Sequence, residues 1–204
     1  MNFISQIYQL IFYQPIFKLL YFLSQTLKDF GMAIFGLTIF IRIIFFPLNF
    51  KMFKNEEKMA KVQKKISEII KKNQKENFKE ILEIYRKEKI NPFSNFLLLL
   101  VQLPILIAIY HILKEPSLFN IPPLFLGYFD LSKPNLIFPL LASFLIILPV
   151  IKQNLSRSSI IYFFAFFTFF ILLKFPSAIS FYILSSLALG LLEKFLIFKK
   201  IWLS

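Results

Sequence analysis

The sequence predicts an all-α membrane protein with five transmembrane helices, an N-terminal interfacial amphipathic helix and a cytoplasmic antiparallel helical hairpin. Apolar residues make up 57% of the 204 and the mean hydropathy is +0.68, which is more apolar surface than a water-soluble domain can bury. They stand in blocks that approach the length an α-helix needs to cross ~30 Å of hydrocarbon. Of the 24 basic residues, 13 lie in the single polar segment 51–89.

Residues 1–30 are predicted to form an amphipathic helix that lies in the membrane interface. The stretch is apolar, but it has neither the basic start nor the small-residue cleavage site of a signal peptide. Polar residues and a proline also interrupt it too often for a transmembrane span: Gln6, Gln9, Gln14, Pro15 and Lys18. An interfacial position suits such a helix better.

The first transmembrane helix is predicted at 31–50, and a cytoplasmic helical hairpin follows at 51–92. Each arm of the hairpin has apolar residues at three- and four-residue spacing, which is typical of a helix with one apolar face. These residues are Met59, Val62, Ile66, Ile69 and Ile70 in the first arm, and Phe78, Ile81, Leu82 and Tyr85 in the second. Pro92 ends the second arm, because proline disfavours the α conformation in the residue before it.

The remaining chain alternates apolar blocks with short polar segments. We predict transmembrane helices 2 to 5 at 93–113, 136–151, 160–174 and 176–197, with an outer loop at 114–135, a cytoplasmic loop at 152–159 and a short basic cytoplasmic tail at 198–204. The apolar block 160–173 would span only ~21 Å as a helix. A span that is shorter than the hydrocarbon thickness favours local thinning of the bilayer.

The distribution of charge predicts the orientation and excludes several functions. The excess of Lys and Arg places the hairpin and the C-terminus in the cytoplasm and the N-terminus outside. The hairpin does not have the pattern of aromatic residues interleaved among charges that is typical of a nucleic-acid surface, so we expect no sequence-specific binding of nucleic acid. The absence of cysteine excludes disulfides and thiolate zinc sites, and no motif for phosphate binding, metal-dependent hydrolysis or a serine nucleophile occurs. We therefore predict no catalytic residues, no cofactor and no metal.

Arg42 is the most informative single residue. It precedes Lys51 by nine residues and so lies well inside the hydrocarbon, where an arginine costs from ~2.5 to more than 10 kcal/mol. We expect no acidic partner for it within the membrane, because Glu193 stands near the cytoplasmic end of the last span and Asp29 and Asp130 lie outside. An unpaired arginine at this depth predicts a hydrated cavity. The alternative is that Arg42 extends towards the cytoplasmic headgroups.

Other polar residues of the spans could line the same cavity. Thr38 and Asn49 fall on the helical face of Arg42, and Gln102 lies in the middle of the second span. The last two spans add Thr168, Tyr182, Ser185 and Ser186. For each Ser and Thr, a hydrogen bond to a backbone carbonyl of its own helix is the alternative role. For His111, at the outer end of the second span, we expect a packing role rather than proton transfer.

Several segments, in order, resemble the YidC/Oxa/Alb family of membrane protein insertases. Residues 31–48, GMAIFGLTIFIRIIFFPL, resemble the first core span of the family, and KMAKVQKKI resembles the start of its cytoplasmic hairpin. EKINPF and LLLLVQLPILIAIY resemble the exit from the hairpin into the next span. FLGYFDLSKPNLIFPL and KFPSAISFYILSSL resemble the outer loop with the third span, and the fifth span. The match runs from about Pro15 to Ile197 and corresponds to a short form without the large periplasmic domain.

The resemblance implies a non-enzymatic insertase of the bacterial plasma membrane. Such a protein receives hydrophobic segments of nascent membrane proteins in a hydrophilic, positively charged groove and releases them into the bilayer, alone or with the Sec translocon. Arg42 would be the cation of the groove, Gln102 a polar residue that lines it, and Tyr182 a substrate contact. The resemblance also implies that the hairpin meets ribosomes, targeting factors or Sec. The tail after Lys200 is shorter than the basic tail that some members offer to ribosomes.

Two other functions remain open from the sequence. A small anion transporter or channel could use Arg42 as its binding site, although repeats or glycine-broken helices at the midplane, which are typical of transporters, do not occur. A membrane-anchored assembly factor could bind its partner through the hairpin alone. Replacement of Arg42 would distinguish these functions from an insertase.

Overall fold

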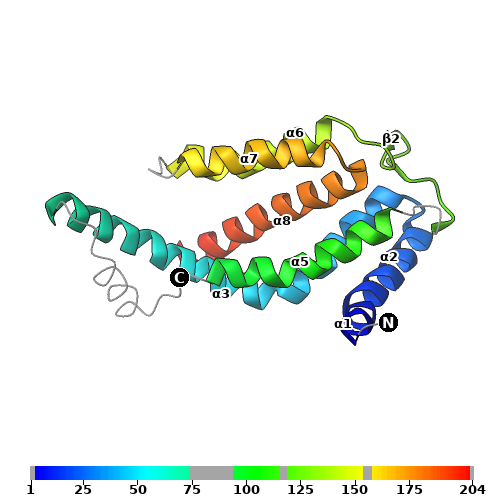
Figure 1. The fold of residues 1–204 in the computed structure, drawn as a ribbon, viewed down its shortest axis with the longest axis horizontal. Coiled ribbons are helices and arrows are strands. Elements are labelled where there is room, and N and C mark those ends of the chain that lie inside the picture. The colour runs from blue at the N-terminus through cyan, green and yellow to red at the C-terminus, as the bar shows by residue number, and fades with distance from the viewer. Residues whose placement is uncertain (1–2, 74–93, 115–118, 154–157, 203–204) are drawn as a thin grey trace. The chain divides into compact units, whose positions relative to one another are not determined.

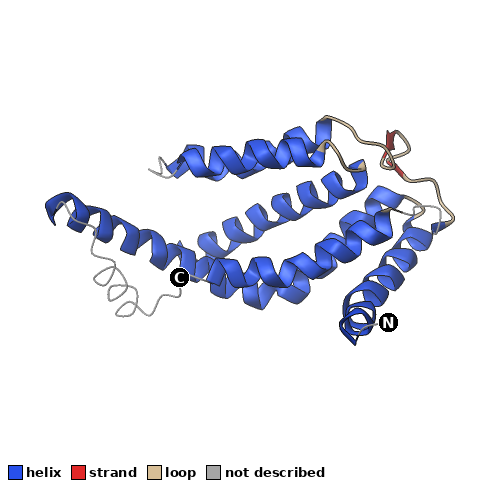
Figure 2. Ribbon diagram, in the orientation of Figure 1, coloured by secondary structure: helices blue, strands red, loops and turns tan. Residues whose placement is uncertain are grey.

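The computed structural model describes residues 3–73, 94–114, 119–153 and 158–202, and these are mostly helical (Figure 2). The chain divides into two compact units, Met1–Ile43 with Pro104–Ser204, and Ile44–Leu103. Helices α3 (Phe30–Asn73) and α5 (Ser94–Leu113) contribute to both units. The predicted second arm of the hairpin falls on residues 74–93 and lies outside the described residues.

The first unit begins with three short helical segments in succession. α1 (Phe3–Tyr8) is followed by a π-helical turn, η1 (Gln9–Tyr13), and by α2 (Gln14–Leu27). Pro15 lies in the first turn of α2. Ile16, Leu20 and Ser24 recur every four residues and are buried, whereas Phe22 on the opposite side is exposed. The helix is therefore amphipathic, as the sequence predicts.

α2 ends and α3 begins at two adjacent residues. Lys28 has a φ of 53°, the left-handed conformation that often terminates a helix, and its N–H donates to the Ser24 carbonyl at 3.0 Å. Asp29 Oδ1 accepts a hydrogen bond of 2.8 Å from the Met32 N–H and so caps α3. α3 then continues through Pro47 and past residue 50, the predicted end of the first span.

Three helices form the C-terminal half of the first unit: α6 (Ile137–Gln153), α7 (Ser158–Leu172) and α8 (Ser177–Trp202). α6 packs against both α7 and α8, and α6 and α7 lie side by side in Figure 1. Ala142 of α6 and Ala165 of α7 are fully buried. Small residues at such positions let helix backbones approach closely, and alanine does this here in a chain with only 4 glycines.

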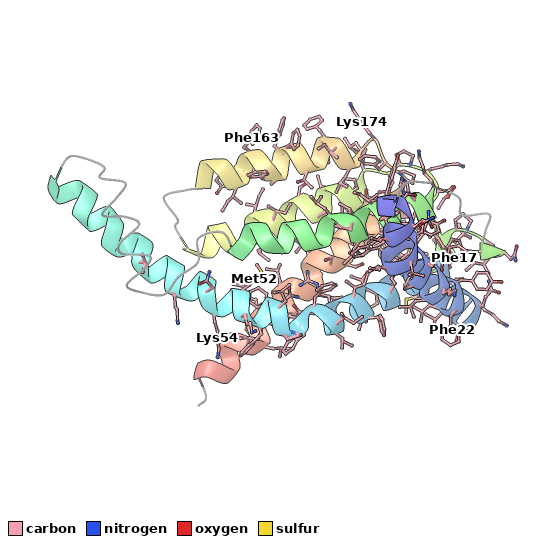
Figure 3. The ribbon with its side chains drawn as sticks, turned by 60° about the horizontal axis from the view of Figure 1, so that its bottom comes forward. Phe17, Phe22, Met52, Lys54, Phe163 and Lys174 are labelled. Atoms are coloured by element: carbon pink, nitrogen blue, oxygen red, sulfur yellow. The ribbon has the colours of Figure 1, made fainter. Side chains whose placement is uncertain are left out.

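The outward side of α7 is almost entirely aromatic. Its exposed residues include Phe163, Phe164, Phe166, Phe167 and Phe170, and Figure 3 shows Phe163 pointing away from the neighbouring helices. Exposure of such an apolar surface is unfavourable in water and favourable in the hydrocarbon of a bilayer. Within the described residues, two helices are long and apolar enough to cross a membrane, Phe30–Asn55 and Ser177–Ile197. Three shorter apolar helices lie at Leu103–Leu113, Ile137–Pro149 and Ile161–Leu172.

The second unit contains the remainder of α3 and the first part of α5. Val62, which the sequence places on the apolar face of the first hairpin arm, is buried, and so is Met52. Lys54 extends its ammonium group over the ring of Phe50, 4.5 Å from the centroid, and Figure 3 labels both Met52 and Lys54 on this helix.

The predicted outer loop contains a small antiparallel strand pair that sequence analysis missed. β1 (Leu124–Phe125) pairs with β2 (Phe129–Asp130), and Leu126 and Gly127 turn the chain between them with φ angles of 53° and 74°. Asp29 Oδ2 accepts a hydrogen bond of 2.7 Å from the Leu126 N–H. One carboxylate thus caps α3 and also holds the turn of the strand pair.

The same loop also holds the start of α8. The Ala178 N–H donates to the Leu131 carbonyl at 2.9 Å, and both the N–H and the hydroxyl of Ser177 donate to the Lys133 carbonyl. α3 and α8 therefore begin at one end of the first unit, attached to one loop, and run from there in the same direction (Figure 1). This shared origin fixes which residues of the two helices lie at the same level.

Candidate functional site

Arg42 and Gly190 lie at the same level of the first unit. Arg42 is twelve residues after Phe30, the first residue of α3, and Gly190 is thirteen residues after Ser177, the first of α8. At ~1.5 Å per residue, both are about 18–20 Å from the ends that the outer loop holds. The guanidinium of Arg42 therefore meets α8 in the middle of its apolar length.

The Arg42 guanidinium binds two residues of α8. Nη1 donates to Glu193 Oε2 at 3.0 Å, and Nη2 donates to Ser186 Oγ at 3.1 Å and to the Ser186 backbone carbonyl. The side chains of Arg42 and Glu193 are 16% and 15% exposed. Hydrogen bonds between ionised groups are stronger than neutral ones, and more so where water is scarce. The site is a largely buried, hydrogen-bonded ion pair that joins α3 to α8.

The expectation that Arg42 has no acidic partner within the membrane is therefore wrong. That expectation considers only how close Glu193 lies to the C-terminal end of its own helix. The alignment of α8 with α3 is set instead at their N-terminal ends, by the loop to which both helices are bonded. Glu193 lies only three residues beyond Gly190, and side chains on an α-helix point back towards its N-terminus. Its long side chain thereby returns to the level of Arg42, 151 residues away in sequence.

Gly190 is a residue in contact with Arg42 that sequence analysis missed. A Cβ atom at this position would lie 2.7 Å from Arg42 Nη2, 2.8 Å from Nη1 and 3.0 Å from Cζ. Only glycine lets the guanidinium lie directly against the backbone of α8. The available signal was a glycine in the middle of an apolar helix, where it costs roughly 0.5–1 kcal/mol relative to alanine.

Of the predicted site residues, Ser186 of α8 is hydrogen-bonded to Arg42. Tyr182 is buried and stands one turn before Ser186 on the same helical face. Ser185, which precedes Ser186 in the sequence, is also buried. Tyr182, Ser186, Gly190 and Glu193 thus form one stripe of α8, which we call the Arg42-facing stripe.

The other predicted residues are not joined to Arg42 by the described contacts. Thr38 is buried, but its hydroxyl donates to the Ile34 carbonyl at 2.7 Å, the alternative role considered for it. Thr168 is partly exposed on α7 and, among the described side chains, makes no hydrogen bond with Arg42. Asn49 is buried and belongs to the second unit. The side chain of Gln102 lies outside the described residues.

His111 has a packing role in the last turn of α5, as expected. Its Nδ1 lies 3.2 Å from the hydroxyl of Tyr8, and the two rings meet edge to face with centroids 6.2 Å apart. This contact attaches α1 to α5. Partial burial, with a smaller contribution from Tyr13, raises the pKa of the Tyr8 phenol above its ordinary value.

The arrangement around Arg42 suits electrostatic binding better than bond chemistry. Its described residues offer a cation, a carboxylate and hydroxyl groups, but no nucleophile next to a base. Within the part of the chain that the structure describes, no three His, Asp or Glu residues stand close enough together to hold a metal ion. An apolar helical unit with outward aromatic surfaces and a largely buried ion pair between two helices defines the class: an integral membrane protein with a polar centre.

Comparison with known proteins gives the family. The family model described as 60Kd inner membrane protein matches residues 22–202. The chain belongs to this family of inner-membrane proteins.

The similar proteins are insertases. The chain is 38% identical to the membrane protein insertase YidC of Buchnera aphidicola over 133 residues, which are 63% of this chain and 25% of that protein. It is 31% identical to that of Oceanobacillus iheyensis over 162 residues, 75% of this chain and 62% of that protein. An active YidC insertase crystal structure matches with a TM-score of 0.74 and 26% identity, covering 91% of this chain and 45% of the other. The resemblance found in the sequence is thus confirmed, and the chain spans less than two thirds of these relatives.

Proposed function

We propose that this chain is a membrane protein insertase of the bacterial inner membrane. It receives hydrophobic segments of nascent proteins beside the Arg42-facing stripe and releases them into the bilayer, alone or with the Sec translocon. The observation that carries the proposal is the largely buried Arg42 guanidinium on an apolar helix, held by Glu193 and Ser186, in a chain of this family. Most of a transported segment is apolar, but its polar flank needs a polar partner inside the hydrocarbon.

The proposed topology has five spans, at α3, α5, α6, α7 and α8. The N-terminus lies outside, α1 and α2 lie in the interface, and the hairpin and C-terminus are cytoplasmic. The basic segment 51–89 supports this orientation, because Lys and Arg are enriched on the cytoplasmic side. The outward aromatic surface of α7 and the amphipathic α2 support the membrane and interface positions respectively.

Two features lower the barrier for a polar tail that crosses the bilayer. Arg42 provides a cation at mid-depth and the Arg42-facing stripe provides hydrogen-bonding groups, with Thr38, Thr168 and Ser185 as further lining of a hydrophilic groove. α7 has 15 residues and covers about 22 Å, less than the ~30 Å of hydrocarbon, so the bilayer beside it is thinned. A thinner bilayer with polar groups at mid-depth reduces the free-energy cost of dehydrating the polar tail as it crosses.

The partners follow from this function. The bilayer and nascent membrane proteins are the direct ones. The basic hairpin is the contact for ribosomes, targeting factors or the Sec translocon. No step requires bond chemistry, a cofactor or a metal.

Insertion into liposomes that contain the purified chain tests the proposal. The substrate is a single-span protein with an acidic N-terminal tail, and protease protection of the tail measures insertion. Arg42→Gln should reduce the inserted fraction about tenfold or more, because it removes the cation from mid-membrane. Lys174→Gln is the matched control, since it removes one positive charge from an exposed side chain after α7 and should leave insertion unchanged.

Three outcomes would contradict the proposal. Equal insertion by wild type and empty liposomes would exclude an insertase. Flux of small anions that depends on Arg42, without insertion of protein, would favour a transporter. Retention of full insertion by a folded Arg42→Gln variant would show that the cation is not used.

A further inference from the structure

The cation of the proposed substrate site already has an acid partner from its own chain. In this structure, Glu193 is bonded to Arg42 at 3.0 Å, and both side chains are about one-sixth exposed. We propose that Glu193 is a built-in competitor for substrate carboxylates at Arg42, and that Glu193 and Gly190 together determine which incoming segments the site accepts. The inference rests on the proposed insertase function and assigns the specificity of the same site.

The competition follows from the charges of the pair. A free guanidinium would attract any segment that carries polar or acidic groups. A guanidinium that is already bonded to a carboxylate gives little to a neutral amide, because the amide would have to replace a charge-assisted bond with a weaker one. A substrate carboxylate can replace Glu193 with a charge-assisted hydrogen bond of nearly equal strength. The pair therefore lowers capture of acidic tails and excludes neutral ones more strongly.

Gly190 allows the guanidinium to lie where it is bonded to Glu193. Without a Cβ, the head group of Arg42 lies against the backbone of α8, where Nη2 reaches both the hydroxyl and the carbonyl of Ser186. A methyl group would come within 2.7–3.0 Å of three guanidinium atoms. The guanidinium is the far end of a flexible side chain, so it would move away rather than unfold the helix.

Two substitutions weaken the competition by different means. Glu193→Gln removes the competing charge but keeps the shape of the side chain. Gly190→Ala changes no charge and displaces the guanidinium from Ser186 and Glu193. Both variants keep the positive charge of Arg42, which a substrate carboxylate can then bind. Asp130→Asn is the charge-matched control, because it removes one carboxylate from strand β2.

The experiment measures capture by photocrosslinking with the full chain in nanodiscs. Two single-span peptides carry a photoreactive group and differ only in the tail, which has Asp in one and Asn at the same positions in the other. We expect Glu193→Gln and Gly190→Ala to increase crosslinking of the Asp peptide about tenfold relative to wild type, the factor that corresponds to about 1.4 kcal/mol of removed competition. Asp130→Asn should remain near wild type. Arg42→Gln should abolish the difference between the peptides.

An unchanged or reduced capture of the Asp peptide in the folded Glu193→Gln and Gly190→Ala variants would overturn the inference. If one variant fails to fold, the other decides. Protease protection in liposomes reports insertion separately. Normal insertion with unchanged capture would reject the competition alone. Absence of insertion by wild type, with capture that responds as expected, would reject the insertase function and leave competition at Arg42 intact.

Discussion

The Arg42 guanidinium and the Glu193 carboxylate meet at 3.0 Å across 151 residues of sequence, although each stands on a separate apolar helix. The relationship exists because α3 and α8 are attached to one outer loop and run in parallel from it. It turns an arginine that would be costly in hydrocarbon into half of a hydrogen-bonded pair.

The ion pair predicts strong coupling between its two members. Arg42→Gln or Glu193→Gln alone leaves a largely buried charge without its partner, which costs about 3 kcal/mol of stability. The double variant removes both charges and should lose less than the sum of the two single losses, with a coupling of at least about 1.5 kcal/mol. Thermal unfolding of the purified variants in one detergent measures the cycle. Additive losses would mean that the pair does not form.

The glycines of α3 and α8 provide a matched comparison. A Cβ at Gly36 would meet Leu23 at 3.4 Å, an ordinary contact, so Gly36→Ala should stabilise the helix by roughly 0.5–1 kcal/mol. Gly190→Ala has the same gain in helix propensity but displaces Arg42, and its net effect should be near zero or destabilising. Unfolding temperatures of both variants in parallel test this. Equal stabilisation would show that Gly190 does not hold the guanidinium.

Gly31 should resist replacement for a different reason. Its Cβ would lie 2.4–2.6 Å from three carbons of the Phe125 side chain, and the Phe125 ring is packed against Phe181 with centroids 4.5 Å apart. A ring confined in this way cannot move without disturbing the loop, so Gly31→Ala should cost about 1–3 kcal/mol. Addition of Phe125→Ala should recover part of the loss, because the clash disappears. Absence of any recovery would point to another cause.

Asp130 predicts a small dependence of stability on pH at the outer loop. Hydrogen bonds from the hydroxyl and then the N–H of Ser132 lower the pKa of this carboxyl below its ordinary value, with Lys133 contributing less. A pKa that is lower in the folded state gives stabilisation above the unfolded pKa of ~3.9, and it is lost as the pH falls through the folded pKa. Ser132→Ala should raise the pKa, which carboxyl NMR titration measures. An unchanged pKa would exclude the hydroxyl as its cause.

Hydropathy and charge are local properties of the chain, and for this reason the sequence by itself determined the class of protein. Apolar blocks and the basic segment 51–89 predict a helical membrane protein, and the ordered motifs indicate the family that the comparisons confirm. Arg42 is recognisable because a charge inside an apolar helix is costly wherever its partner lies. The amphipathic α2 and the packing role of His111 are also predictable from local patterns.

The partner of Arg42 was decided by tertiary structure alone. Periodicity places a residue on a face of its own helix, but it carries no information on the level at which a second helix crosses that face. Here the level is set by hydrogen bonds of the outer loop, from Leu126 to Asp29 and from Ala178 to Leu131, far from the site in sequence. These bonds bring Gly190 and Glu193 to Arg42, and they convert an expected free cation into a bonded pair.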